Sequence, residues 1–231
     1  MRISLMLAIG AVVLGACSGS DAPGDGLLVV LDDGNVVVMD RTGESRLAIT
    51  DAEATGPTRT FNFQPVWSPD GNFIASSTIS PDTGLHVATA DGERSWTIDT
   101  STLPFYFSWS ADGDLAMLRN ADGGSLRLDL TSLDGDELAE PKMLETGAPL
   151  YFSWSPDGAR LATHIGEDRL DTSDLTSSQP LGPQPGAFPA PQWTARGIVA
   201  VEQGSRDQTL VIIDPDDGSS QPLGLVRGPT T

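Results

Sequence analysis

The sequence predicts an all-β protein, a β-propeller of about five four-stranded repeat units. A phrase of the form Trp-Ser-x-Asp-Gly recurs along the chain, and its tryptophans are 42, 45 and 39 residues apart. A second phrase, Ser-Ser-Gln-Pro-Leu-Gly, occurs identically at 177–182 and 219–224, again 42 residues apart. Four-stranded propeller blades repeat about every 40–45 residues, whereas a β-sandwich requires no fixed period. The 25 Gly and 17 Pro residues also favour short strands and turns over long helices.

The tryptophan phrase predicts a strand that ends in Trp and is followed by a tight turn, because Gly adopts positive φ without steric cost. We expect each Trp to pack between blades, and a stacking platform for sugars is the alternative. The fifth unit has Arg196 in place of the Asp. The signature residues, to which we assign a structural role, are Trp67, Asp70, Gly71, Trp109, Asp112, Gly113, Trp154, Asp157, Gly158, Trp193 and Gly197.

Strand and turn signals divide the chain from residue 26 onward into repeat units. The first unit has no tryptophan strand, so its three apolar runs predict three strands instead of four. The expected units cover about 26–50, 61–100, 103–147, 149–185 and 188–226.

The phrase at 67–71 and 154–158, followed by a short apolar strand, resembles the TolB-like propeller repeat, a relative of the WD-type repeats. The resemblance covers about residues 27–224, and it implies six or seven blades in a closed ring. The next signature tryptophan would fall at position 235, beyond Thr231. We therefore expect an incomplete ring, truncated from a larger propeller; five blades that close imperfectly are the alternative.

The N-terminus predicts a lipoprotein signal peptide at residues 1–16, with Arg2 ahead of an apolar stretch. The tetrapeptide Leu-Gly-Ala-Cys that ends at Cys17 resembles the lipobox of bacterial lipoproteins, which implies lipidation of Cys17. An ordinary signal peptide followed by a stray thiol is the alternative. Residues 17–25 then form a lipidated flexible tether. The implied location is the cell membrane or outer membrane, on its extracytoplasmic face, with the membrane itself as a partner through the lipid.

The formal charge is −19, with a single lysine in the chain. Nucleic acid is an unsuitable partner, because phosphate binding requires clustered Lys and Arg. The acidity is typical of solubility outside the cytosol, and it leaves a basic partner or a cation-binding surface open.

No catalytic or metal-binding pattern is indicated. His86 and His164 lie in different units, and zinc requires three or four protein ligands. The acidic turns at 134–137 and 214–218 lack the ligand offsets of a calcium loop. Neither a nucleophile elbow, a P-loop nor a dinucleotide fingerprint is present. We expect no enzyme activity, no metal and no cofactor.

The leading hypothesis is a membrane-anchored, extracytoplasmic propeller that acts as a non-catalytic scaffold and binds another envelope protein. One alternative is the propeller portion of a prolyl-oligopeptidase-like hydrolase without its catalytic domain. Another is a propeller that binds a small ligand, glycan or cation in its channel.

Overall fold

The computed structural model describes residues 27–50, 60–79, 83–185, 190–204 and 207–226. The expected signal peptide, Cys17 and the tether lie outside these residues.

The described strands form five antiparallel sheets, one per sequence repeat, and confirm the all-β prediction. The first two sheets contain β1 (Leu27–Asp32), β2 (Asn35–Asp40) and β3 (Arg46–Ala48), then β4 (Phe61–Trp67), β5 (Phe73–Ile79), β6 (Gly84–Thr89) and β7 (Ser95–Asp99). The third contains β8 (Pro104–Trp109), β9 (Asp114–Asn120), β10 (Leu126–Asp134), β11 (Glu137–Leu138) and β12 (Lys142–Gly147), with the 3₁₀ turn η1 (Asp122–Gly124). The last two contain β13 (Leu150–Trp154), β14 (Leu161–Ile165), β15 (Arg169–Ser173) and β16 (Ser178–Pro180), then β17 (Gln192–Thr194), β18 (Gly197–Gln203), β19 (Gln208–Ile213) and β20 (Ser220–Val226).

Strand counts differ between the sheets. The first sheet has three described strands, as its missing tryptophan phrase predicts, and the second, fourth and fifth have four. The third sheet has five, because the long strand β10 pairs with two partners: β12 along 126–130 and β11 at 133–134. The two Ser-Ser-Gln-Pro-Leu-Gly phrases both fall on the fourth strand of a sheet, β16 and β20.

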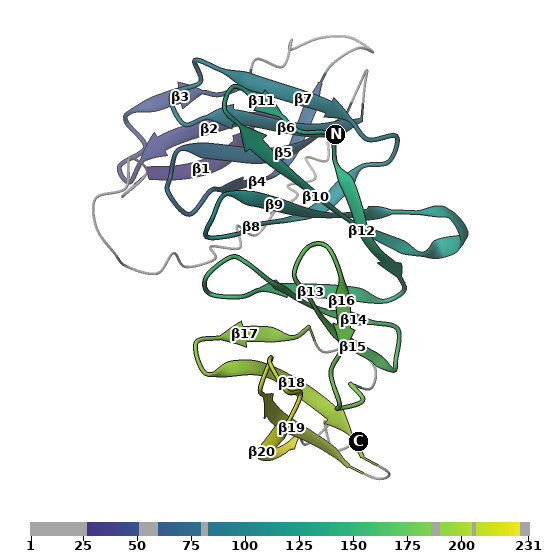
Figure 1. Ribbon diagram of the computed structural model, residues 1–231. Coiled ribbons are helices and arrows are strands. Elements are labelled where there is room, and N and C mark those ends of the chain that lie inside the picture. Colours follow the sequence, from purple (N-terminus) through teal and green to yellow (C-terminus); the bar gives the residue numbers. More distant parts are fainter. Residues whose placement is uncertain (1–26, 51–59, 80–82, 186–189, 205–206, 227–231) are drawn as a thin grey trace, which may run out of the picture.

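The sheets follow one another in chain order and form an open arc (Figure 1), with the first and fifth sheets at opposite ends. Apolar layers separate them because side chains alternate along each strand. In β9, Leu115 and Met117 pack toward the second sheet, while Ala116 and Leu118 pack toward the fourth. Equivalent layers join the first sheet to the second and the fourth to the fifth. Each inner sheet is therefore buried on both faces.

Candidate functional site

The signature turn is held by its own serine and aspartate. In the fourth unit the Ser155 hydroxyl donates to Asp157 at 2.5 Å and accepts the Arg160 amide at 2.9 Å. The second unit repeats both bonds, from Ser68 to Asp70 at 2.5 Å and from the Phe73 amide to Ser68 at 2.9 Å. Their glycines, Gly71 and Gly158, have φ of 70° and 78°. The Ser155 hydrogen bond lowers the pKa of Asp157. These carboxylates are acceptors within a turn.

Two units vary this turn. The third unit is one residue shorter, so the Ser110 hydroxyl accepts the amide of Asp114, at 2.9 Å. Burial, and then the charge of Asp112, raise the pKa of Asp114. In the fifth unit, Thr194 donates to the carbonyl of Gly197 at 2.9 Å. Threonine thus replaces the serine in the degraded phrase.

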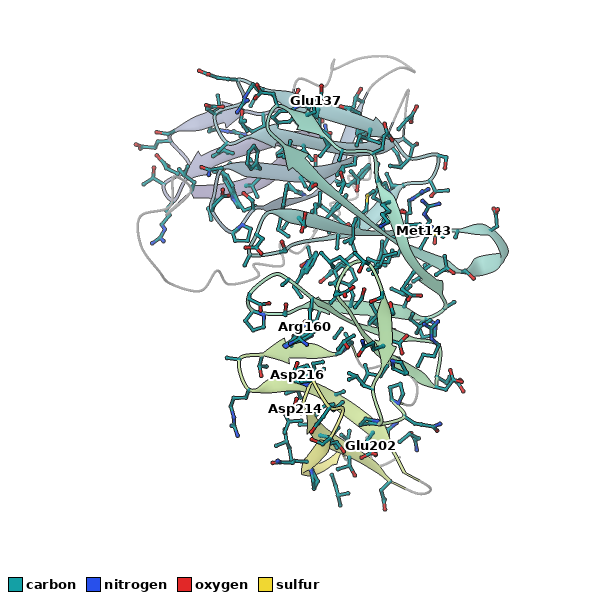
Figure 2. The ribbon with its side chains drawn as sticks, in the orientation of Figure 1. Glu137, Met143, Arg160, Glu202, Asp214 and Asp216 are labelled. Atoms are coloured by element: carbon teal, nitrogen blue, oxygen red, sulfur yellow. The ribbon has the colours of Figure 1, made fainter. Side chains whose placement is uncertain are left out.

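The signature tryptophans lie at the sheet interfaces. Trp109 and Trp154 are buried, and Trp154 Nε1 donates to the carbonyl of Ser108 on the preceding sheet at 3.0 Å. The Arg160 guanidinium lies 5.0 Å from the ring of Trp193. Arg160 also points toward Asp216 of the fifth sheet, at 2.8 Å (Figure 2). The geometry is that of interblade packing.

Trp67 and Trp96 occupy two further interfaces. Trp67 packs partly buried against the apolar layer between the first two sheets. Trp96, which lies outside the signature register, is partly buried against the layer between the second and third sheets. Its Nε1 donates to the backbone carbonyl of Asp136 at 2.8 Å, so this ring also joins neighbouring sheets.

A buried ion cluster in the third sheet was not among the predicted site residues. Asp129 is fully buried and accepts hydrogen bonds from Arg119 Nε at 2.7 Å and Arg127 Nε at 2.6 Å. In the fourth sheet, Arg169 pairs with the buried Asp171 at 2.6 Å. Both pairs belong to the tripeptide Arg-Leu-Asp, at 127–129 and 169–171, 42 residues apart. That third repeat is the sequence signal that would have revealed them.

These clusters tie the third and fourth sheets to the sheets that precede them. The guanidinium of Arg119 donates to the carbonyl of Thr100 at 2.7 Å, in the connection between the second and third sheets. Arg169 lies 3.6 Å from Glu145 on β12, across the next interface. The cluster carboxylates accept hydrogen bonds from arginines, and those arginines reach the preceding sheet.

The histidines lie apart, on β6 and β14. Burial lowers the pKa of His86. His164 is fully buried, with its ring 5.8 Å from that of Tyr151. Among the described residues, no group of three or more His, Cys, Asp or Glu side chains is arranged to hold a metal ion. In the same part of the chain, no helix has the length and apolar character needed to cross a bilayer.

Exposed aromatic side chains gather on the first strands of neighbouring sheets. Phe61 and Phe63 on β4 and Tyr106 on β8 are exposed, and Tyr151 on β13 is partly exposed. β4 contacts β8, and β4, β8 and β13 follow one another along the arc (Figure 1). We call these four residues the aromatic row. Tyr106 packs edge to face on Phe152 of the fourth sheet, with ring centroids 5.4 Å apart. This contact fixes the position of the Tyr106 ring.

A cavity of about 530 Å³ opens between the first two sheets. Leu27, Phe73 and Arg94 line it, together with the second sheet's turns. Arg94 also pairs with Asp136 of the third sheet. The cavity is therefore bordered by apolar side chains and by a cation that already has a partner.

Comparison with known proteins supports the fold. No family model matches the sequence, and no curated protein matches it. A puromycin hydrolase mutant complexed with PGG is similar, with a TM-score of 0.62 and 19% identity over 88% of this chain and 37% of its own. A prolyl endopeptidase has a TM-score of 0.58 and 15% identity, over 85% of this chain and 36% of its own. The Pyrococcus horikoshii acylaminoacyl peptidase has a TM-score of 0.54 and 14% identity, over 85% of this chain and 36% of its own.

The chain spans little more than a third of the length of these enzymes. The likeness to these structures concerns the fold alone, and it confirms the predicted β-propeller.

Proposed function

We propose that this protein is a lipid-anchored, non-catalytic β-propeller that binds another protein of the cell envelope. The aromatic row is the observation that carries this proposal. Tyr and Phe are enriched in the buried centres of protein interfaces, and exposed apolar groups that cluster mark interaction surfaces more than isolated ones do. Lipidation of Cys17 would hold this surface close to the membrane, since two or more acyl chains anchor a protein stably.

Site-specific crosslinking tests the proposal. A photoreactive residue at Tyr106 is expected to capture one recurrent envelope protein, and the same group at Met143, exposed on the outer strand β12, is the matched control. The double variant Phe63→Ala, Tyr106→Ala should weaken binding of the captured protein by at least about tenfold, because truncated interface anchors typically cost 1–2 kcal/mol each. Equal capture from both positions, or unchanged affinity of the double variant, would refute the proposal.

A second candidate function follows from the structural neighbours, which are propeller parts of peptidases. In this alternative the chain is the propeller portion of a prolyl-oligopeptidase-like hydrolase. The genomic sequence after Thr231 distinguishes the two functions. An α/β-hydrolase domain with a nucleophile elbow supports the hydrolase, whereas a stop codon supports the scaffold.

A further inference from the structure

The first sheet lacks, among its described strands, the strand that begins every other sheet. In the second sheet the amide of Thr89, at the end of β6, donates to the carbonyl of Arg94. In the first sheet the amide of Asp40, at the end of β2, makes the same bond to Ser45. Strand β2 therefore corresponds to the third strand of a blade and β1 to the second. The described strands leave the inner edge of β1 without a neighbour.

Exposure along β1 agrees with an inner edge that none of the described strands covers. Leu31 faces the second sheet yet keeps 40% of its surface exposed. Its equivalents on β5, β9 and β14 are Ser77, Leu118 and His164, with 0%, 5% and 0% exposed. Each of those strands has a first strand paired along its inner edge. The open edge exposes apolar side chains together with backbone groups that require partners.

The indole of Trp67 borders the same edge of the first sheet and has no hydrogen-bond partner. Trp154 Nε1 donates to the carbonyl of Ser108, which lies on the first strand of the preceding sheet. Trp67 stands at the equivalent position of the second sheet, and its Nε1 is buried without a hydrogen-bond partner. An equivalent acceptor would belong to a first strand of the first sheet, which the described part of the chain does not contain. Trp109 Nε1 also lacks a partner although the second sheet has its first strand, β4, so the inference rests on the exposure of β1 and not on the indole.

The cavity of about 530 Å³ lies at the start of β1. It is lined by Leu27, the first residue of β1, and by Phe73 at the start of β5. The space therefore adjoins only the first residue of β1 and the turns of the second sheet.

We infer that the inner edge of β1 binds an extended strand of a partner protein, antiparallel to β1 and aromatic or apolar at alternate positions. The other sheets define this chemistry, since the equivalent position in the fourth sheet holds Leu-Tyr-Phe-Ser-Trp, residues 150–154. Strand addition of this kind draws affinity from backbone hydrogen bonds and specificity from alternate side chains. The inference rests on the proposed protein-binding function and names its mode.

Other occupants fit the arc less well. The last strand, β20, is already paired in the fifth sheet, at the opposite end of the molecule (Figure 1). In a second copy of the chain, the described first strands β4, β8, β13 and β17 are all paired within their own sheets. None of the described strands is therefore available to pair with the inner edge of β1, whereas a strand from another protein requires no rearrangement of the described sheets.

A synthetic peptide with the sequence of residues 150–158 tests the inference on the chain from Cys17 to Thr231. Saturable binding by fluorescence anisotropy is expected, with slower hydrogen exchange of the amides at 27–32. Two peptides N-methylated at alternate residues provide the control. Only one set of amides faces β1, so one peptide should bind at least about tenfold more weakly while the other keeps its affinity. Leu31→Glu should weaken binding, and Leu225→Glu, on the exposed strand β20, should not.

Three outcomes would overturn the inference. One is absence of saturable binding, and another is an equal effect of the two methylated peptides. The third is slow hydrogen exchange of the β1 amides already in the free protein, which would mean that the edge is covered. Light scattering then distinguishes coverage by a second copy, which gives a dimer, from coverage by the same chain, which gives a monomer. Crosslinking at Tyr106 is independent of all three, so the proposed function can stand if strand addition fails.

Discussion

Removal of the Asp129 carboxylate is expected to destabilise the third sheet strongly. The side chain of Asp129 is fully buried, while those of Arg119 and Arg127 keep 12% and 30% of their surface exposed. In the variant Asp129→Ala both guanidinium groups lose their acceptor. Breaking a buried ion pair by removing one partner typically costs about 3–5 kcal/mol. Because Arg127 retains access to water, we expect the lower part of this range, about 3 kcal/mol.

Urea unfolding followed by tryptophan fluorescence measures this loss. With a slope of roughly 2–3 kcal/mol per molar urea, the midpoint should fall by about 1–1.5 M. Asp136→Ala is the matched control, because that carboxylate pairs with Arg94 but is 85% exposed. An exposed pair contributes about 1 kcal/mol or less, so the control midpoint should stay close to that of the native chain.

The result that refutes the reasoning is an Asp129→Ala variant that loses no more stability than Asp136→Ala. A triple variant checks the cause. Replacement of Asp129, Arg119 and Arg127 together by Leu and Met removes the charges as well as their partner, and it should recover most of the loss. Without that recovery, the loss would come from packing around Asp129 and not from uncompensated charge.

Three further predictions concern a turn, an exposed carboxylate and the anchor. Gly158→Ala should destabilise the protein more than Gly113→Ala in the same urea assay. Both glycines have positive φ, but only at Gly158 would the new Cβ lie 2.8 Å from a backbone nitrogen, that of Ala111. Hydrogen bonds, of which that from the Thr42 hydroxyl has the largest effect, lower the pKa of Asp40 to about 2. The stabilisation that these bonds give is therefore complete above the unfolded pKa near 3.8, and it is lost as the pH falls toward 2. Thr42→Val should raise this pKa, and an unchanged midpoint in a carboxyl NMR titration would contradict the assignment. Cys17→Ala should move the protein from the membrane to the soluble fraction, and a variant that stays with the membrane would contradict lipid anchoring.

Much of the fold could be predicted from periodicity, because each blade repeats the same local sequence pattern of strand and turn. Residues adjacent in sequence determine the strand that ends in Trp154 and the turn that Ser155 and Asp157 hold. They also determine the glycine with positive φ in that turn. The three-stranded first sheet follows in the same way from its missing phrase. The fifth strand of the third sheet does not, because β10 continues past its pairing with β12 and pairs again with β11 at residues 133–134.

The candidate site was less predictable for a physical reason: its elements meet only across sheets. The aromatic row joins Phe63 and Tyr106, which are 43 residues apart. The sequence contained the repeated Arg-Leu-Asp, yet only the folded chain brings Arg119 from the neighbouring strand to complete the cluster around Asp129.

The sequence by itself determined the repeat, its period of about 42 residues and the turn chemistry, since these depend on neighbours along the chain. The tertiary structure alone decided which faces are covered. Among the described residues it leaves the inner edge of β1 unpaired, and it buries the carboxylates of Asp129 and Asp171. Burial and edge pairing are properties of segments brought together from distant parts of the chain, so no local pattern specifies them.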